Sequence, residues 1–301
     1  MPARAADVRQ ERVAVMGGAA HLVLVGGSRR ALGAAVERLH DLERRWSRFR
    51  PDSEITGLND HPGRPRRVST ETVLLVGLAQ EGWRRTAGRF DPTLLHALRA
   101  AGYGDALPRG AATPAAPTRT AHDPATCGRI ALDRDAGTVC LPPGAGFDPG
   151  GIGKGLAADL VAGDLLDSGA AGACVNVGGD LRLWGHGPSG PRWRVAIPAL
   201  PGRALALTDA AVATSGTTRR RWTVDGRVHH HLIDPATLRP SRTGIASATV
   251  AAPAAWLAEV YAVAALLSTP RRAVADLARW GVDGAVVADD GTARVSPGLR
   301  A

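Results

Sequence analysis

The order of the apolar patterns along the chain constrains its fold more than any other feature. Residues 29–47, residues 69–86 and the stretch after Lys154 place apolar side chains three or four positions apart, which is typical of amphipathic helices. Short alternating or apolar runs typical of strands lie before, between and after these stretches. Because strands and helices do not alternate strictly, the sequence favours an α+β fold over a doubly wound sheet of βαβ units.

Turn residues indicate where neighbouring strands pair. Met16-Gly17-Gly18 separates two strand-like runs near the N-terminus, and Asp225-Gly226 is a strong hairpin turn between two four-residue runs. In chain order, strands are expected at residues 12–15, 21–25, 129–141 (a hairpin), 173–177, 181–184, 193–197, 205–207, 211–214, 221–224, 227–230, 247–250 and 285–287. The helix after Lys154 is expected to stop at Gly169, and two more helices are expected at residues 253–267 and 270–280.

Two stretches are expected to be loops. Residues 47–59 show no regular pattern, and residues 104–126 are rich in Ala, Pro, Thr and Gly without periodicity, which predicts a flexible loop. No internal repeat is evident. The whole chain, residues 1–301, is therefore interpreted as a single domain, long enough to bury a sizeable core.

Charge and cysteine content exclude several classes of protein. The net charge of +9 suggests affinity for anions, but the arginines are scattered and no basic stripe is interleaved with aromatic residues, so no nucleic-acid partner is expected. Three widely spaced cysteines argue against a disulfide framework and a CxxC zinc site. No apolar run is of signal-peptide or membrane-spanning type, so a cytoplasmic location without membrane insertion is expected.

The only lysine of the chain, Lys154, lies within a glycine-rich run. Glycine lets the backbone approach a ligand closely, and a compact ammonium suits a phosphate. The start of the following helix would add the positive end of its dipole. The run matches neither common phosphate loop: Gly155 stands where a P-loop has Ser or Thr, and Leu156 stands where the Rossmann pattern has its last glycine. A purely structural strand–turn–helix connection remains open.

Four other stretches combine small residues with one or two polar groups at expected strand ends. They are residues 88–93, 175–180, 213–216 and 229–235. Each is weak evidence alone, since an Asp-Pro-Thr sequence is usually a helix cap and a histidine run usually lies on the surface. Their order and spacing along the chain are the informative features.

Together with the lysine run, these stretches resemble the ApbE family of FAD:protein FMN transferases, over residues 16–267. The family's Met-Gly-Thr corresponds to residues 16–18, its Ser-x-Tyr-x-x-x-Ser-Glu to 47–54, its Phe-Asp-Pro-Thr to 90–93, its Asp-Leu-Gly-Gly-Ile-Ala-Lys-Gly to 148–155, its Asn-x-Gly-Gly-Asp to 176–180, its Ser-Gly to 215–216 and its His-Ile-Ile-Asp-Pro-x-Thr to 231–237.

The resemblance implies a fold, a reaction and a set of site residues. The fold would be ApbE-type (T-fold-like) α+β, with the flavin site in a cleft between two lobes. The reaction would move the FMN part of FAD, with Mg²⁺, to a threonine hydroxyl of a target flavoprotein and release AMP. The residues that would contact the flavin nucleotide are Met16, Phe49, Arg89, Phe90, Asp91, Asp148, Lys154, His231 and Leu232.

The metal site and the catalytic base are less well specified. The Gly151 carbonyl and Glu259 would hold Mg²⁺, because a hard cation prefers oxygen ligands. The family has Asp at position 259 and Thr four residues later; this chain has Glu259 and Val263, which offers no oxygen. Lys154 and the metal would offset the pyrophosphate charge, and either His231 or Asp180 could accept the threonine proton.

Two other functions remain as alternatives. The protein could bind FAD, or hydrolyse it to FMN and AMP, without flavinylating a protein; the lost oxygen at Val263 motivates this reading. It could also be a basic scaffold or nucleic-acid-binding protein without enzymatic activity, which the net charge alone suggests.

Overall fold

A computed structural model describes residues 7–104, 123–197, 199–224 and 227–299 of the chain. Most of the loop predicted at residues 104–126 and the predicted Asp225-Gly226 turn lie outside these residues.

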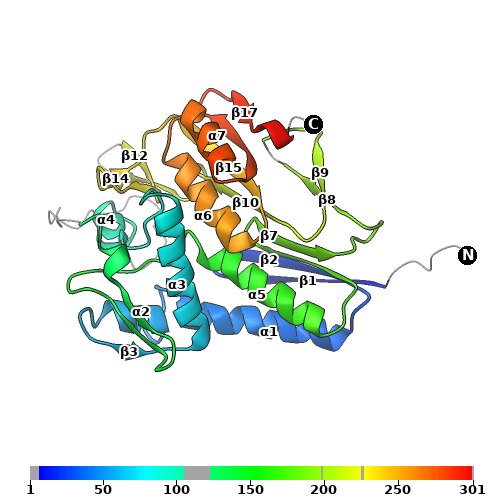
Figure 1. Cartoon of the computed structure of the whole chain (residues 1–301), viewed down its shortest axis with the longest axis horizontal. Coiled ribbons are helices and arrows are strands. Elements are labelled where there is room, and N and C mark those ends of the chain that lie inside the picture. The colour runs from blue at the N-terminus through cyan, green and yellow to red at the C-terminus, as the bar shows by residue number, and fades with distance from the viewer. Residues whose placement is uncertain (1–6, 105–122, 198, 225–226, 300–301) are drawn as a thin grey trace, which may run out of the picture.

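An antiparallel sheet of eight strands forms the centre of the fold (Figure 1). In spatial order its strands are β1 (Val8–Val15), β2 (Gly18–Val25), β6 (Gly172–Val177), β7 (Asp180–Gly185), β10 (Ala211–Gly216), β15 (Ile245–Ala252), β16 (Asp283–Ala288) and β17 (Ala293–Val295). Every neighbouring pair in this order is antiparallel. The prediction of an α+β fold is confirmed, and each strand predicted in this sheet is present.

Helices cover one face of the sheet (Figure 1). Those that pack on the sheet are α1 (Arg29–Trp46), α5 (Gly153–Asp167), α6 (Ala255–Leu266) and α7 (Pro270–Arg279), and α3 (Thr70–Arg85) packs on α1 and α6. Alternation along the strands turns Leu22, Val175 and Ala213 toward these helices, where they join the main hydrophobic core. The predicted helices at 29–47, 69–86, 253–267 and 270–280 are confirmed to within two residues at each end.

The opposite face of the sheet is covered in part by a hairpin of β8 (Trp193–Ala196) and β9 (Ala204–Leu207). Trp193 and Val195 of this hairpin pack on Val23, Leu183 and Val212 of the sheet. Short elements complete the fold: α2 (Glu54–Asn59), α4 (Leu95–Ala100), β3 (Arg66–Arg67), β4 (Ala131–Asp133), β5 (Thr138–Cys140), β11 (Arg221–Val224), β12 (Arg227–His230), β13 (Ile233–Asp234), β14 (Arg239–Pro240) and two 3-10 turns at Cys127–Arg129 and Pro297–Leu299.

The prediction of a loop at residues 47–59 is wrong for the second half of this segment, which forms helix α2. The Ser53 hydroxyl accepts a hydrogen bond from the Thr56 amide at 3.0 Å and so caps the helix. Ile55 and Leu58 are buried in the main core. Six residues are too few to show a helical period in sequence, and tertiary burial supplies the stability that such a short helix lacks.

No helix among the described residues has the length and apolar character needed to cross a lipid bilayer. The expected cleft between two lobes stays a prediction.

Candidate functional site

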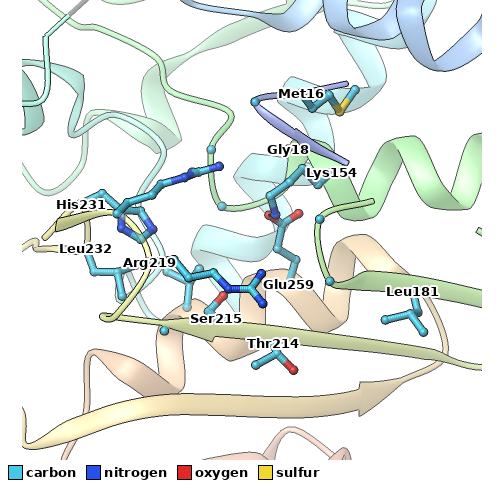
Figure 2. Close-up of a pocket in the computed structure, with 18 of the residues that line it drawn as sticks. Met16, Gly18, Lys154, Leu181, Thr214, Ser215, Arg219, His231, Leu232 and Glu259 are labelled. Carbon is cyan, nitrogen blue, oxygen red and sulfur yellow. The ribbon is translucent and has the colours of Figure 1, made fainter. Parts of the chain in front are cut away.

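A large cavity of about 1260 Å³ opens at the sheet end where β6 turns into β7 (Figure 2). It is lined by all of the residues predicted to contact the flavin nucleotide or the metal: Met16, Phe49, Arg89, Phe90, Asp91, Asp148, Gly151, Lys154, His231, Leu232 and Glu259. These residues come from segments far apart in the chain. Asp180, a candidate base, does not line the cavity and lies buried behind Lys154.

Lys154 is the centre of a buried ion cluster. Its Nζ forms an ion pair with Asp180 and lies 2.5 Å from Oε1 of Glu259. Both carboxylates are almost completely buried, whereas a fifth of the Lys154 side chain remains exposed toward the cavity. An ammonium has three N–H donors. The two carboxylates occupy two of them, which leaves one donor for a ligand.

The charges of this cluster shift the pKa of its members. Burial alone would lower the pKa of Lys154, but the Asp180 and Glu259 charges outweigh burial and raise it, so the amine stays protonated. Burial raises the pKa of Glu259 above its usual range, against the opposing effect of Lys154. Two carboxylates share one ammonium, so a further cation bound at the site would favour the ionised form of Glu259.

Close packing of helices α5 and α6 creates this cluster. A Cβ on Gly155 would lie 2.3 Å from the Ala255 carbonyl oxygen, so only glycine lets the two helices approach so closely. The Asp159 carboxylate accepts hydrogen bonds from the amides of Ala255 and Trp256, both at 2.9 Å, at the start of α6. Glu259, one turn further on, therefore reaches the start of α5, where its Oε2 accepts from the Gly155 amide at 2.8 Å.

The turn between β6 and β7 makes room for the lysine. Gly178 and Gly179 both have positive φ, and a Cβ on Gly178 would lie 3.3 Å from Cδ of Lys154. The Asn176 side chain holds the turn by accepting from the Gly179 amide at 2.9 Å. The Asn-x-Gly-Gly-Asp stretch at residues 176–180 is thus a turn that places Asp180 against the Lys154 ammonium.

The residues present fit Mg²⁺ only together with oxygen atoms of a substrate. Glu259 and the Gly151 carbonyl are the protein oxygens that the sequence suggested, and both line the cavity. Cγ2 of Val263 faces Gly151, 3.3 Å from the place a Cβ would take, where an oxygen donor is missing. Among the described residues no cluster of three or more His, Cys, Asp or Glu side chains suits a metal. Mg²⁺ commonly combines one or two carboxylates with substrate phosphates, and this donor set matches that pattern.

An aromatic wall lies on another side of the cavity. Phe49 is 42% exposed, which is unusual for a large apolar side chain. The Arg48 guanidinium lies 4.1 Å from the centroid of the Phe49 ring and 4.8 Å from that of Tyr103. Tyr103 stacks on Trp222 with a centroid distance of 5.3 Å. These contacts hold an exposed aromatic face that can stack against a planar ring.

His231 and Leu232 line the cavity away from the ion cluster in Figure 2. Burial, reinforced by the charge of Arg220, lowers the pKa of His231 to about 3, so the ring is neutral at physiological pH. Its buried Nδ1 has no hydrogen-bond partner among the described residues. A neutral imidazole with a free nitrogen is able to accept a hydrogen bond or a proton from a ligand.

The remaining predicted residues are held in place by the fold. Arg89 forms an ion pair with Asp276 of α7. Asp91 accepts from the Thr93 amide at 2.8 Å and from the Thr93 hydroxyl at 2.5 Å. The Asp148 amide donates to the Pro92 carbonyl at 2.8 Å, which joins the loops around residues 90–93 and 148–155.

Sequence reasoning missed several residues of the cavity wall, among them Tyr103, Leu181, Thr214, Arg219 and Arg220. Figure 2 shows Arg219 reaching into the cavity beside Ser215 and toward Glu259. The arginine run at 219–221 is the longest in the chain and closely follows Ser215-Gly216. The position of this run, shortly after a strand that ends in glycine, was the sequence signal that could have identified Arg219 and Arg220 as cavity residues.

Comparison with known proteins agrees with this geometry. The family model described as "ApbE family" matches residues 12–285. An FAD:protein FMN transferase of Vibrio cholerae is 30% identical over 277 residues, covering 87% of this chain and 81% of the relative. The apo crystal structure of the Pseudomonas stutzeri flavinyl transferase ApbE superposes with a TM-score of 0.86 at 25% identity, covering 99% of this chain and 98% of that one. The ApbE protein of Thermotoga maritima superposes with a TM-score of 0.84 at 26% identity, covering 98% of each chain.

Proposed function

Because the chain belongs to the ApbE family, we propose that it transfers the FMN part of FAD to a threonine hydroxyl of an acceptor flavoprotein, with Mg²⁺, and releases AMP. The observation that carries this proposal is the single cavity that unites the lysine cluster, an exposed aromatic ring and a neutral histidine. The names of the relatives support it, since they are FAD:protein FMN transferases whose alignments with this chain cover 81% and 73% of their own length.

The parts of the cavity have distinct roles in this proposal. The exposed ring of Phe49 stacks against the flavin. The free N–H of Lys154 binds the pyrophosphate, and the Gly151 carbonyl and Glu259 would hold Mg²⁺. When bound, the metal offsets the negative charge that the phosphates bring to an already acidic cluster.

The transfer step exchanges one phosphorus–oxygen bond for another. The threonine oxygen forms a bond to the FMN phosphorus while the bond from that phosphorus to the bridging pyrophosphate oxygen breaks, and AMP leaves with the bridging oxygen. His231 accepts the threonine proton in this proposal, because the residue lines the cavity and its Nδ1 has no hydrogen-bond partner among the described residues. Asp180 positions Lys154, since its carboxylate is buried against the ammonium.

The proposal is tested by incubating the protein with FAD, MgCl₂ and a panel of purified flavoprotein domains. A covalently fluorescent carrier band and one AMP per flavin attached are expected. A mass increase equal to FMN, lost when the acceptor threonine is replaced, identifies the bond. Intact FAD with no labelled carrier under any divalent metal would refute the transferase.

Hydrolysis of FAD is the second candidate, because Val263 leaves the metal site without one oxygen. In that case FMN and AMP would appear in equal amounts without any carrier, and adding carriers would not change their rate of formation.

A further inference from the structure

The cavity extends well beyond the residues expected around the flavin nucleotide. Part of its wall belongs to the sheet face opposite the helices, where strand alternation places His21, Leu181 and Thr214. None of the residues predicted to bind FAD or the metal lies on this part of the wall. We call it the far-face groove; it is formed by His21, Cys174, Leu181, Val195, Val212 and Thr214.

The groove has an apolar floor and a side wall. Leu181 and Val212 belong to the hydrophobic cluster that joins the sheet to the β8–β9 hairpin, and Val195 of the hairpin forms the wall. The Trp193 indole fixes the hairpin by donating to the Trp184 carbonyl at 3.0 Å. Cys174, Leu181 and Thr214 remain half-buried, so the floor is accessible beside the hairpin.

The volume of the cavity leaves space for a second reactant. A pocket for one small molecule typically measures roughly 300–1,000 Å³, and this cavity measures about 1260 Å³. The far-face groove and the Lys154 cluster belong to the same cavity and meet at the β6–β7 turn. Gly179 of that turn has open space where a side chain would stand, so a second chain is able to pass close to the backbone there.

Positive charge lies at the rim of the groove. Arg12 of β1 and Arg194 of β8 are exposed and line the cavity, and Arg12 pairs in register with His21. An extended peptide with acidic side chains complements an apolar floor with a basic rim.

We infer that the far-face groove binds an extended, acidic segment of the acceptor flavoprotein. Binding there would place the threonine of this segment at the β6–β7 turn, where the groove meets the Lys154 cluster. This inference rests on the proposed transferase function. It assigns the two substrates to different surfaces of one cavity: FAD to the helix side of the sheet and the acceptor segment to the opposite face.

Steady-state kinetics of Arg12→Glu tests the inference, with a carrier domain that the wild-type protein flavinylates. The KM for the carrier should rise about fivefold or more, because one attractive rim charge becomes repulsive, whereas kcat and the Kd for FAD should change less than about twofold. Arg271→Glu makes the same charge change on the exposed surface of α7, outside the cavity, and should leave all three values unchanged. The effect of Arg12→Glu should shrink as salt is raised.

Leu181→Glu probes the floor of the groove independently of the rim. It should raise the carrier KM about tenfold or more by placing a carboxylate against the acidic segment, while FAD titration, followed by flavin fluorescence, changes little. If either variant weakens FAD binding as much as carrier binding, the groove belongs to FAD and the inference is overturned. An unchanged carrier KM in both variants overturns it as well. A wild-type protein that labels no carrier refutes the transferase itself, and this inference with it.

Discussion

At the scale of single residues, Lys154 has a structural role and a ligand-binding role at once. Its ammonium is the shared ion-pair partner of Asp180 and Glu259, two carboxylates that the fold buries almost completely. The same ammonium keeps one donor toward the cavity. The sequence left open whether this lysine binds phosphate or only joins a strand to a helix. In the structure the two roles do not exclude each other, so a single substitution would disturb both.

A double-mutant cycle separates the two roles of Lys154. Lys154→Met should lower the free energy of unfolding by about 3 kcal/mol, because it leaves buried carboxylates without a counter-charge. Asp180→Asn in the Lys154→Met background should restore about 1 kcal/mol or more by removing one of those charges. Urea unfolding followed by tryptophan fluorescence measures both. FAD affinity should stay low in the double variant, and its recovery together with stability would show that the lysine is structural only.

At the scale of secondary-structure elements, contact between α5 and α6 assembles the site. The two helices carry Lys154 and Glu259, which are 105 positions apart in the chain. Gly155 allows the contact, and Asp159 fastens the start of α6 to α5. The periodic pattern predicts both helices, but it contains no information about which helix packs on which.

Two glycines of α5 provide a matched test of this contact. Gly155→Ala should destabilise the protein by about 1–3 kcal/mol, because its Cβ would lie 2.3 Å from the Ala255 carbonyl oxygen and α6 must shift. Gly163→Ala in the same helix meets nothing within 4 Å and should stabilise by about 0.5–1 kcal/mol. Thermal and urea unfolding of both variants check the pair. Equal effects of the two substitutions would contradict the importance of close helix contact.

At the scale of the whole molecule, one end of the sheet gathers residues from both of its faces. Helices bring the ion cluster from one side, and the β8–β9 hairpin forms the groove on the other. The described residues around Lys154 supply few oxygens for a metal, so we expect metal binding and FAD binding to be strongly coupled. Coupling between two ligands is reciprocal and appears in the stability of the entire fold.

Thermal unfolding with the two ligands tests this coupling. MgCl₂ alone should change Tm little, FAD alone should raise it moderately, and both together should raise it by more than the sum. Val263→Thr adds an oxygen beside Gly151 and should increase the Tm shift caused by MgCl₂ in the presence of FAD. Addition of EDTA should abolish the extra shift. A large shift with MgCl₂ alone would instead indicate a preformed metal site.

The sequence by itself located most of the helices and strands of this protein and identified most of its candidate site residues. Periodicity and turn residues locate most helices and strands, because those signals are local. They miss α2, whose six residues depend on burial for stability. Motif order also pointed to several residues that line the cavity around Lys154, including Gly151 and Glu259, but not to Arg219.

Only the tertiary structure decided which of these residues contact one another and which of them line the cavity. Strand order places β6 and β7 between β2 and β10, and helix packing sets Glu259 against Lys154. Asp180 therefore lies behind the lysine rather than on the cavity surface, and the far-face groove exists because a distant hairpin folds over the sheet. Such contacts depend on packing between segments far apart in the chain, and a local sequence pattern therefore does not predict them.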